Sequence, residues 1–382
     1  MPKLSTAEKK LLVYLHAIDG VGQGRLRELI KKRQKSKQNL LNIWSNGQGA
    51  AHFIKDKKTY QNYQTFKLEY NINSYWHQLE KKQIKTLFLG DRLYPSLLKV
   101  TAFAPAVLYL WYQHPQALKL LQSRLPVAVV GTRKITQYGR YVTKKITTEL
   151  ANLGAVVVSG FMYGVDTYAH EAAIAAGGGT IAVLGFGFDH IYPASHQAVF
   201  ERLSSEKTLF ISQFPPHTQA HPGNFPARNA TVAGLSLGVV VTEAAEKSGS
   251  HITAQLALDE GRVVMAVPGP IDNPYSQGTK WLINQGAVLV TSGEEVLREV
   301  GWKGDQKTTL VAQAPPSSSA PLEFDSDEEK RLYELVLSQV VTADEIADEL
   351  GFEISRVNLL LTSLELKGAV KRVGVKWEGV RG

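Results

Sequence analysis

Short apolar segments alternate with amphipathic ones through the middle of the chain. Nearly continuous apolar strands separated by segments of helical period are typical of a parallel sheet covered on both faces. We therefore predict an α/β domain with a doubly wound, mostly parallel Rossmann-like sheet and right-handed crossovers. The predicted strands are Val127–Val130, Ala155–Val158, Thr180–Leu184, Leu209–Ile211, Val239–Thr242, Val263–Ala266 and Ala287–Val290. The predicted helices between them include Tyr138–Leu153, Asp166–Ala176, Ile252–Glu260 and Gly278–Gln285.

The N-terminal region also repeats its apolar residues with a helical period, interrupted by Gly20-Val21-Gly22. This pattern predicts a helix, a tight turn and a second helix, the plan of a helix-hairpin-helix (SAM-like) domain. The backbone amides of such a turn can face a phosphate, and a basic run from Lys31 to Lys37 follows it. The same pattern fits a small helical domain with a solvated lysine face, and the sequence leaves both interpretations open.

The C-terminal region predicts a winged helix. Three short amphipathic helices are expected at Asp327–Ser338, Thr342–Leu350 and Ile354–Leu366, and a β-wing at Ala369–Trp377 around Gly374. Thr342 and Glu345 have the spacing of a capping box, and Gly351 ends the second helix. Such modules bind DNA or protein, and the acidic residues here do not favour a phosphate-facing surface. The expected domains are helical 1–80, Rossmann-like 81–302, a Pro- and Ser-rich linker 303–322 and winged helix 323–382.

Charge and composition narrow the class of protein. The 382 residues carry 43 Lys and Arg against 35 Asp and Glu, a formal charge of +8. Such an excess suggests an anionic partner such as nucleic acid. The chain has no cysteine, which excludes disulfides and thiolate metal sites and fits a cytoplasmic location. No apolar run approaches the roughly 20 residues of a membrane span, and no histidines and carboxylates have metal-ligand spacing. We expect no metal, no cofactor and no membrane contact.

Candidate phosphate-binding residues follow the predicted strands. The carboxyl ends of parallel strands share one edge of a sheet, where ligands of such folds bind. After the first strand, Gly131 and Thr132 allow close approach, Arg133 offers a donor fork, and the next helix presents its amides. Ser248, Gly249 and Ser250 form a second anion nest after a later strand. Two anion sites on one edge suit a ligand with several phosphates. Further candidates at this edge are Ser159, Gly160, Gly164, Gly185, Gly187, Arg228 and Asn229.

Other residues near this edge have a supporting or an open role. Asp166 stands where it can cap a helix, with His170 one turn later on the same face. The pair is either an acid–base couple or a capping aspartate hydrogen-bonded to a structural histidine. Glu243 and Thr253 are expected to support the second nest. Phe161 and Tyr163 either stack on bases or pack within the domain.

A long series of motifs resembles the DNA-processing protein A (DprA/Smf) family. The resemblance extends over nearly the whole chain, including the helical start and the winged-helix end. The motifs are Gly90-Asp91-x-x-Tyr94-Pro95, Gly131-Thr132-Arg133, Ser159-Gly160, Gly164-x-Asp166, Thr180-Ile181-Ala182-Val183-Leu184-Gly185-x-Gly187, Tyr192-Pro193, Phe225-Pro226-x-Arg228-Asn229, Glu243-Ala244, Ser248-Gly249-Ser250-x-Ile252-Thr253 and Val267-Pro268-Gly269. Three positions depart from the family pattern, which usually has other residues at Gln213, His196 and Ala230.

This resemblance implies a non-catalytic protein that binds incoming single-stranded DNA in natural transformation. It implies delivery of the RecA recombinase onto that DNA, and a homodimer. The family's phosphate contacts fall here on Arg133 and Arg228.

Two other classes remain as alternatives. A nucleotide-binding enzyme related to the phosphoribohydrolases is one, because those enzymes have similar Rossmann-like folds. Their Pro-Gly-Gly-x-Gly-Thr-x-x-Glu signature is absent, since Pro268-Gly269-Pro270 is the nearest match and no glutamate follows at the required spacing. The dinucleotide fingerprint G-x-G-x-x-G is absent after the first strand. A protein-interaction scaffold is the other alternative, and we expect no catalytic residue.

Overall fold

The chain folds into two compact units, Met1–Lys303 and Gly304–Gly382. The computed structural model describes residues 4–36, 38–46, 53–54, 56–302, 324, 326–338, 341–367, 369–373 and 376–379. The expected linker, residues 303–322, lies outside the described residues, and so does Gly374 at the tip of the expected wing. The two units are described separately.

The first unit is built on one mixed sheet whose strand order is β1-β2-β6-β5-β4-β3-β7-β8-β9. Strands β3 to β9 pair in parallel, whereas β1 and β2 add an antiparallel edge next to β6. The predicted mostly parallel, doubly wound sheet is confirmed. The strands are β1 Lys85–Phe88, β2 Val107–Trp111, β3 Pro126–Val130, β4 Val156–Ser159, β5 Gly179–Leu184, β6 Thr208–Ser212, β7 Gly238–Val241, β8 Val263–Ala266 and β9 Val288–Leu289.

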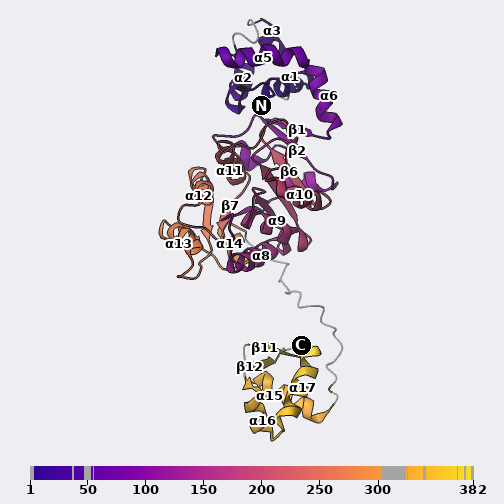
Figure 1. Ribbon diagram of the computed structural model, residues 1–382, viewed down its shortest axis with the longest axis vertical. Coiled ribbons are helices and arrows are strands. Elements are labelled where there is room, and N and C mark those ends of the chain that lie inside the picture. Colours follow the sequence, from indigo (N-terminus) through magenta and orange to yellow (C-terminus); the bar gives the residue numbers. More distant parts are fainter. Residues whose placement is uncertain are drawn as a thin grey trace. The chain divides into compact units, whose positions relative to one another are not determined.

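Alternating side chains of each strand point to opposite faces of the sheet and form two separate layers of the core. Val127 and Val129 of β3 lie in one layer, and Ala128 and Val130 lie in the other, as the two-residue period of a strand requires. The first layer is closed by α8 Gln137–Asn152, α9 Val165–Ala175 and α14 Gly293–Glu299. The second is closed by α11 Asn224–Gly234, α12 Gly249–Asp259 and α13 Gln277–Asn284 (Figure 1). Short helices complete the unit: α7 Ser96–Lys99, α10 Gln197–Ser204, η1 Ala117–Gln122, η2 Ala194–His196 and η3 Pro274–Ser276.

The topology fixes where a ligand site is expected. From β3 the chain adds β4, β5 and β6 on one side, then returns to place β7, β8 and β9 on the other side. The strand order therefore reverses at β3, between its neighbours β4 and β7. A crevice forms at such a switch point, outside the carboxyl ends of the strands, because the flanking loops diverge there.

Helices of the N-terminal region pack beside β1 and β2 (Figure 1). They are α1 Thr6–His16, α2 Gln23–Ser36, α3 Leu40–Asn46, α5 Lys57–Glu69 and α6 Ile72–Lys81. The expected hairpin of two helices is present. In its turn, Val21 is buried and donates its amide to Ile18 O, whereas Gly20 and Gly22 are exposed. The Gln23 side chain bonds backbone atoms of Val107 and Gln213 and holds the start of α2 against the sheet. Contact between the amides of this turn and a phosphate stays a prediction.

The second unit is a winged helix, as predicted. It contains α15 Asp327–Ser338, α16 Ala343–Leu350, α17 Ile354–Leu366 and a three-stranded sheet of β10 Val341–Thr342, β11 Val370–Val373 and β12 Lys376–Gly379. The capping box between Thr342 and Glu345 is confirmed, and Gly351 ends α16 with a left-handed φ of 69°. Eleven buried residues, among them Leu332, Val357 and Trp377, form a core of its own.

Candidate nucleic-acid interface

An open pocket of about 570 Å³ lies at the switch point of the sheet. Its walls come from the loops after β3, β4 and β7 and from the first turns of α11 and α12. Most of the residues singled out in the sequence line this one pocket. These are Gly131, Thr132, Arg133, Gly160, Asp166, Arg228, Asn229, Ser248, Gly249, Ser250 and Thr253. Residues that are far apart in the chain are therefore brought to a single rim.

The loop after β3 holds Arg133 at the mouth of the pocket. Thr132 anchors the loop, because its amide donates to Glu243 O at 2.7 Å and its carbonyl accepts from Val165 N at 3.1 Å. The neighbouring Arg133 is exposed, and its guanidinium lies over the Phe225 ring, 5.3 Å from the centroid. Stacking of this kind restricts the guanidinium while its in-plane N–H donors stay open to solvent. Arg133 makes no ion pair within the described part of the chain, so its donors are available to an anion.

The start of α8 corrects one expectation. The sequence suggested that α8 presents free amides to a ligand, but the chain's own Glu243 carboxylate occupies that position. It accepts from Thr136 N at 2.9 Å, from Thr136 Oγ1 at 2.5 Å and from Asn273 Nδ2 at 3.2 Å. Thr136 in turn caps the helix by accepting from Gly139 N. A carboxylate at a helix N-terminus is electrostatically favourable, so Glu243 ties the β3 loop to the end of β7.

The nest at α12 is also partly occupied by the chain. Ser248 is the N-cap, and its hydroxyl accepts from Ser250 N at 3.3 Å and lies 2.8 Å from the Ser250 hydroxyl. Lys247, directly before this cap, is exposed and lines the pocket. Lys247 was not among the residues predicted from the sequence, although a lysine directly before a Ser-Gly-Ser helix cap could have indicated an anion site. Arg133 and Lys247 thus supply cations from two sides of the rim.

A buried charged pair forms the floor of the pocket. Arg228 is only 4% exposed and donates from Nη1 to Val183 O at 3.1 Å and from Nε to Asn229 Oδ1 at 2.9 Å. Burial lowers the pKa of Arg228 to about 10, whereas the charge of Asp166 acts to raise it. The guanidinium therefore stays protonated near neutral pH. Burial also raises the pKa of Asp166, while Arg228 acts to lower it. Gly160 leaves room for this pair, since a Cβ there would lie 2.3 Å from Arg228 Nη1 and 2.6 Å from Asp166 Oδ2.

Asp166 and His170 do not form the expected couple. The N-cap of α9 is Gly164, with a φ of 75°, and Asp166 instead accepts from Met162 N at 3.3 Å. The His170 ring is fully buried and pairs through Nδ1 with Thr180 Oγ1 at 2.7 Å. Burial lowers the pKa of His170 to about 3, with a contribution from Arg228. The acid–base interpretation is therefore wrong, and so is a capping Asp166 bonded to His170, whereas His170 is a buried structural histidine, as the second interpretation expected.

Ser159, Gly185 and Gly187 are not among the residues that line the pocket. Ser159 is buried and donates to Val129 O at 2.7 Å. Gly185 packs on the Phe225 ring, and Gly187 packs on the carbonyls of Pro215 and Pro216. Of the two suggested stacking residues, Phe161 is 1% exposed and packs in the core, whereas Tyr163 is 44% exposed and lines the pocket.

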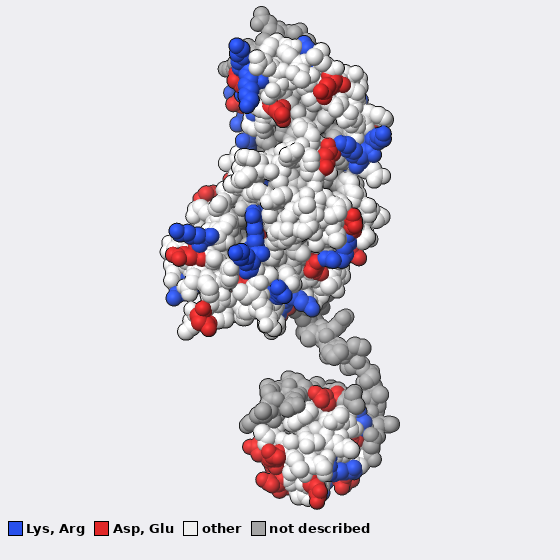
Figure 2. Space-filling view, viewed as in Figure 1, with Lys and Arg blue, Asp and Glu red and all other residues white. Residues whose placement is uncertain are grey.

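The two units differ strongly in charge. The second unit has nine Lys and Arg against fourteen Asp and Glu, a formal charge of −5, which leaves +13 on the first unit. Figure 2 shows Lys and Arg side chains scattered among Asp and Glu over the visible face of the first unit, some of them in the region of α8 and α12, while Asp and Glu predominate on the visible face of the second. The attraction for an anion therefore belongs to the unit that carries the pocket.

Two features of the described residues concern metals and membranes. Within the ranges that the structure describes, no group of three His, Asp or Glu side chains lies close enough to hold a metal ion. Among the same residues, none of the helices combines the length and the apolar character that crossing a membrane needs.

Fold and pocket together define a Rossmann-like protein with a basic, open rim at its switch point and a separate winged-helix unit. The profile of the family described as DNA recombination-mediator protein A matches residues 85–301, and that of the DprA winged helix domain matches residues 313–374. The chain belongs to this DprA/Smf family.

Individual relatives agree with this assignment. DNA processing protein DprA of Bacillus subtilis is 39% identical over 59% of this chain and 74% of its own length. Protein Smf of Escherichia coli is 37% identical over 77% of each chain. The X-ray structure of DNA processing protein A from Streptococcus pneumoniae is similar over 78% of this chain and 99% of that chain, with 32% identity and a TM-score of 0.64. The expected family and fold are thereby confirmed.

Proposed function

We propose that this chain binds single-stranded DNA along the rim of its sheet and promotes loading of the RecA recombinase onto it. The observation that carries the proposal is the placement of Arg133, stacked on Phe225 at the mouth of an open pocket, with Lys247 from the loop after β7 lining the same pocket. An anion site with cations on two sides suits consecutive phosphates of a strand. A mononucleotide needs only one of these two cations.

Exposed aromatic rings favour a single strand over a duplex. Tyr163 and Tyr192 both line the pocket and are 44% and 40% exposed. Unpaired bases can stack on such rings, at about 1–3 kcal/mol per base. Bases within a duplex are already stacked and paired, so they gain nothing from these rings.

The alternative, a nucleotide-processing enzyme, has less support. Among the described residues that line the pocket, the one carboxylate is that of Asp166, which is 7% exposed and accepts from Met162 N. A carboxylate that acts on a nucleotide must reach the bound substrate. We therefore propose a binding protein without catalytic residues and without a metal or nucleotide cofactor.

RecA loading and homodimerisation rest on membership of the recombination-mediator family. A mediator must hold single-stranded DNA and release it to the recombinase, which suits an electrostatic site better than a tight enclosed one. A cytoplasmic location follows from that partner. Sedimentation of the full chain tests the dimer. The lag before recombinase nucleation on protein-coated single strands tests loading, and we expect the wild type to shorten that lag.

The binding site is tested by fluorescence anisotropy with labelled single-stranded and double-stranded oligonucleotides over a salt series. Arg133→Ala should weaken single-strand binding about tenfold, the loss of one charge-assisted contact. It should also reduce the slope of log affinity against log salt by about 0.7.

Arg124→Ala is the matched control, because Arg124 is an exposed arginine just before β3, at the opposite end of the same strand. Removing it changes the net charge equally. Equal effects of the two substitutions would mean that the rim is not the binding site. Absent binding to single strands would overturn the proposed function as a whole.

A further inference from the structure

A second pocket, of about 420 Å³, lies between the N-terminal helices and two loops of the Rossmann-like sheet. We call it the helical pocket. Its volume is within the usual range for small-molecule sites. It shares no lining residue with the rim pocket. Its lining residues are Ala17, Asp19, Asn62, Thr65, Phe66, Glu69, Tyr70, Tyr75, Gln78, Leu79, Lys82, Asp189, Pro216 and His217.

Three aromatic rings meet in the helical pocket. The ring centroids of Phe66 and Tyr70 are 5.1 Å apart, those of Phe66 and Tyr75 are 5.5 Å apart, and those of Tyr70 and Tyr75 are 5.9 Å apart. Phe66 and Tyr70 are half-buried, so part of each ring is open to a ligand. Clustered aromatic faces attract organic cations through their negative quadrupoles.

The charged groups of the helical pocket are mostly acidic. Lys82 is already engaged, because its Nζ bonds both carboxylate oxygens of Asp189 at 2.7 and 2.8 Å. Among the described residues, Asp19 has one ion-pair partner, His217 at 3.8 Å, and a histidine is a cation only when protonated. Glu69 makes no ion pair within the described residues. The carboxylates of Asp19 and Glu69 therefore lack a permanent cation, and a phosphate would be repelled here.

Tyr75 contributes the third and most deeply buried of these rings. The residue is 5% exposed and lines the pocket. Its hydroxyl has no hydrogen-bond partner among the described residues, and the oxygen has less than 1 Å² of accessible surface. The pocket therefore does not open onto that oxygen, and Tyr75 contributes its ring to the site.

We propose that the helical pocket binds an organic cation, an alkylammonium or guanidinium group. The rings of Phe66 and Tyr70 would contact the face of the cation, and the Glu69 and Asp19 carboxylates would neutralise it. This site goes beyond the proposed DNA binding and does not depend on it. The cation belongs either to a free polyamine or to a lysine or arginine side chain of a protein partner.

Isothermal titration of the full-length protein with two probes tests the site: spermidine, and a short peptide with a single arginine. We expect saturable binding with one site and a dissociation constant of about 1 mM or tighter for at least one probe. Binding of spermidine alone identifies a free polyamine as the ligand. Binding of the peptide alone identifies a side chain of a partner.

Three substitutions link the binding to the helical pocket. Glu69→Gln and Asp19→Asn should each weaken it about threefold to tenfold, the range for single contacts to a partly desolvated cation. Glu28→Gln is the matched control, since Glu28 is an exposed glutamate on α2 outside this pocket. It should leave the affinity unchanged.

Two results would overturn the proposal. One is the failure of both probes to bind tighter than about 10 mM. The other is an equal loss of affinity in Glu69→Gln and Glu28→Gln, which would indicate general attraction to an acidic surface. Oligonucleotide anisotropy on the same variants separates the two sites, because Glu69→Gln should leave single-strand binding intact.

Discussion

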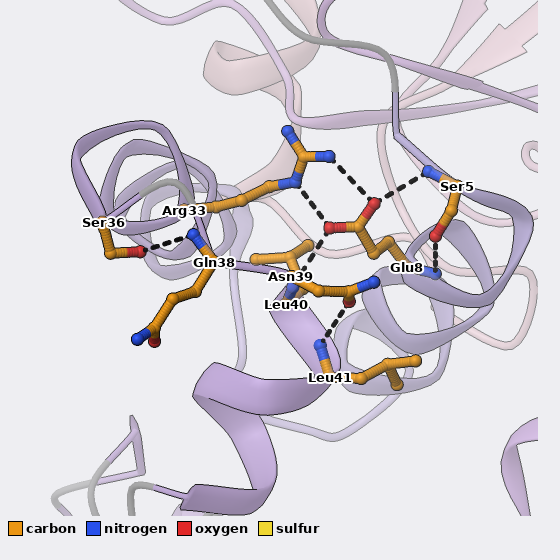
Figure 3. A network of polar contacts seen from close by, with 8 residues as sticks. All are labelled: Ser5, Glu8, Arg33, Ser36, Gln38, Asn39, Leu40 and Leu41. Atoms are coloured by element: carbon orange, nitrogen blue, oxygen red, sulfur yellow. Dashed lines mark hydrogen bonds and ion pairs between the residues drawn. The ribbon is translucent and has the colours of Figure 1, made fainter.

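The carboxylate of Glu8 holds together the start of the N-terminal helices (Figure 3). Its side chain is 1% exposed and accepts hydrogen bonds from Arg33 Nε at 2.5 Å, Arg33 Nη2 at 3.0 Å, Ser5 N at 2.8 Å and Leu40 N at 3.0 Å. One buried group therefore joins α1, α2 and the start of α3. We predict that removing its charge, by acid or by Glu8→Gln, destabilises the first unit by about 3 kcal/mol.

The magnitude follows from the pKa of Glu8. Burial alone would raise this pKa, but the bonds from Arg33, Ser5 and Leu40 outweigh burial and lower it from 4.5 to about 2. Each pKa unit corresponds to about 1.4 kcal/mol, so the shift amounts to about 3 kcal/mol. Because the folded pKa is depressed, this stability is present in full above about pH 4.5. It is lost as the pH falls toward about pH 2.

Urea unfolding at a series of pH values measures the effect. The wild type should lose free energy of unfolding between about pH 4.5 and pH 2, and Glu8→Gln should already be less stable at pH 7. In the variant, the Arg33 guanidinium, which is 14% exposed, loses its bonds to the Glu8 carboxylate. Hydrogen exchange at the Leu40 amide, which donates to Glu8, gives a local readout of the same bond.

Glu28→Gln again serves as the control, because it removes an exposed charge from α2 and should leave both stability and pH dependence nearly unchanged. If Glu8→Gln loses as much free energy on acidification as the wild type does, the assignment of this pH dependence to Glu8 is refuted. Unchanged stability of Glu8→Gln at pH 7 would contradict the role of the charge itself.

Two more predictions concern the packing around the rim. Gly160→Ala places a Cβ against the Arg228 guanidinium, so we expect at least about tenfold weaker single-strand binding by anisotropy; Gly24→Ala, with nothing within 4 Å, should bind normally. Glu243→Gln cannot accept all the bonds from Thr136 and Asn273, so urea unfolding should show a loss of about 2 kcal/mol. Normal binding by Gly160→Ala, or unchanged stability of Glu243→Gln, would contradict the respective argument.

The central strands were predictable because a strand buried on both faces must be apolar at every position. The run Val127–Val130 is such a case, and β3 contains all of it. The antiparallel strands β1 and β2 were not predicted. The outer residues of β1, Lys85 and Thr86, are polar or partly exposed, and neither strand belongs to the alternation of strand and helix. Helix α11 was missed in part because small residues such as Ala233 and Gly234 give only a weak apolar stripe.

The rim was predictable as a set of loops, since strand topology alone brings the ends of β3, β4 and β7 together. The partners of the individual rim residues were not predictable from the sequence. Asp166 looks like a cap in sequence, but the positive φ of Gly164 starts α9 earlier and turns Asp166 toward Arg228. Glu243 binds Thr136, which is 107 residues away in the chain. No local pattern encodes a contact at that separation.

These partners bear on how the proposed site would hold DNA. At α8 the Glu243 carboxylate faces the helix N-terminus. At α12 the Ser248 hydroxyl accepts a hydrogen bond from the Ser250 amide. The fixed amides that grip a single phosphate tightly in nucleotide-binding folds are thus partly satisfied. The attraction then rests on exposed side chains such as Arg133 and Lys247, which act on any phosphate that passes. Such a site binds a strand through many weak, salt-sensitive contacts, and a recombinase can displace those contacts one at a time.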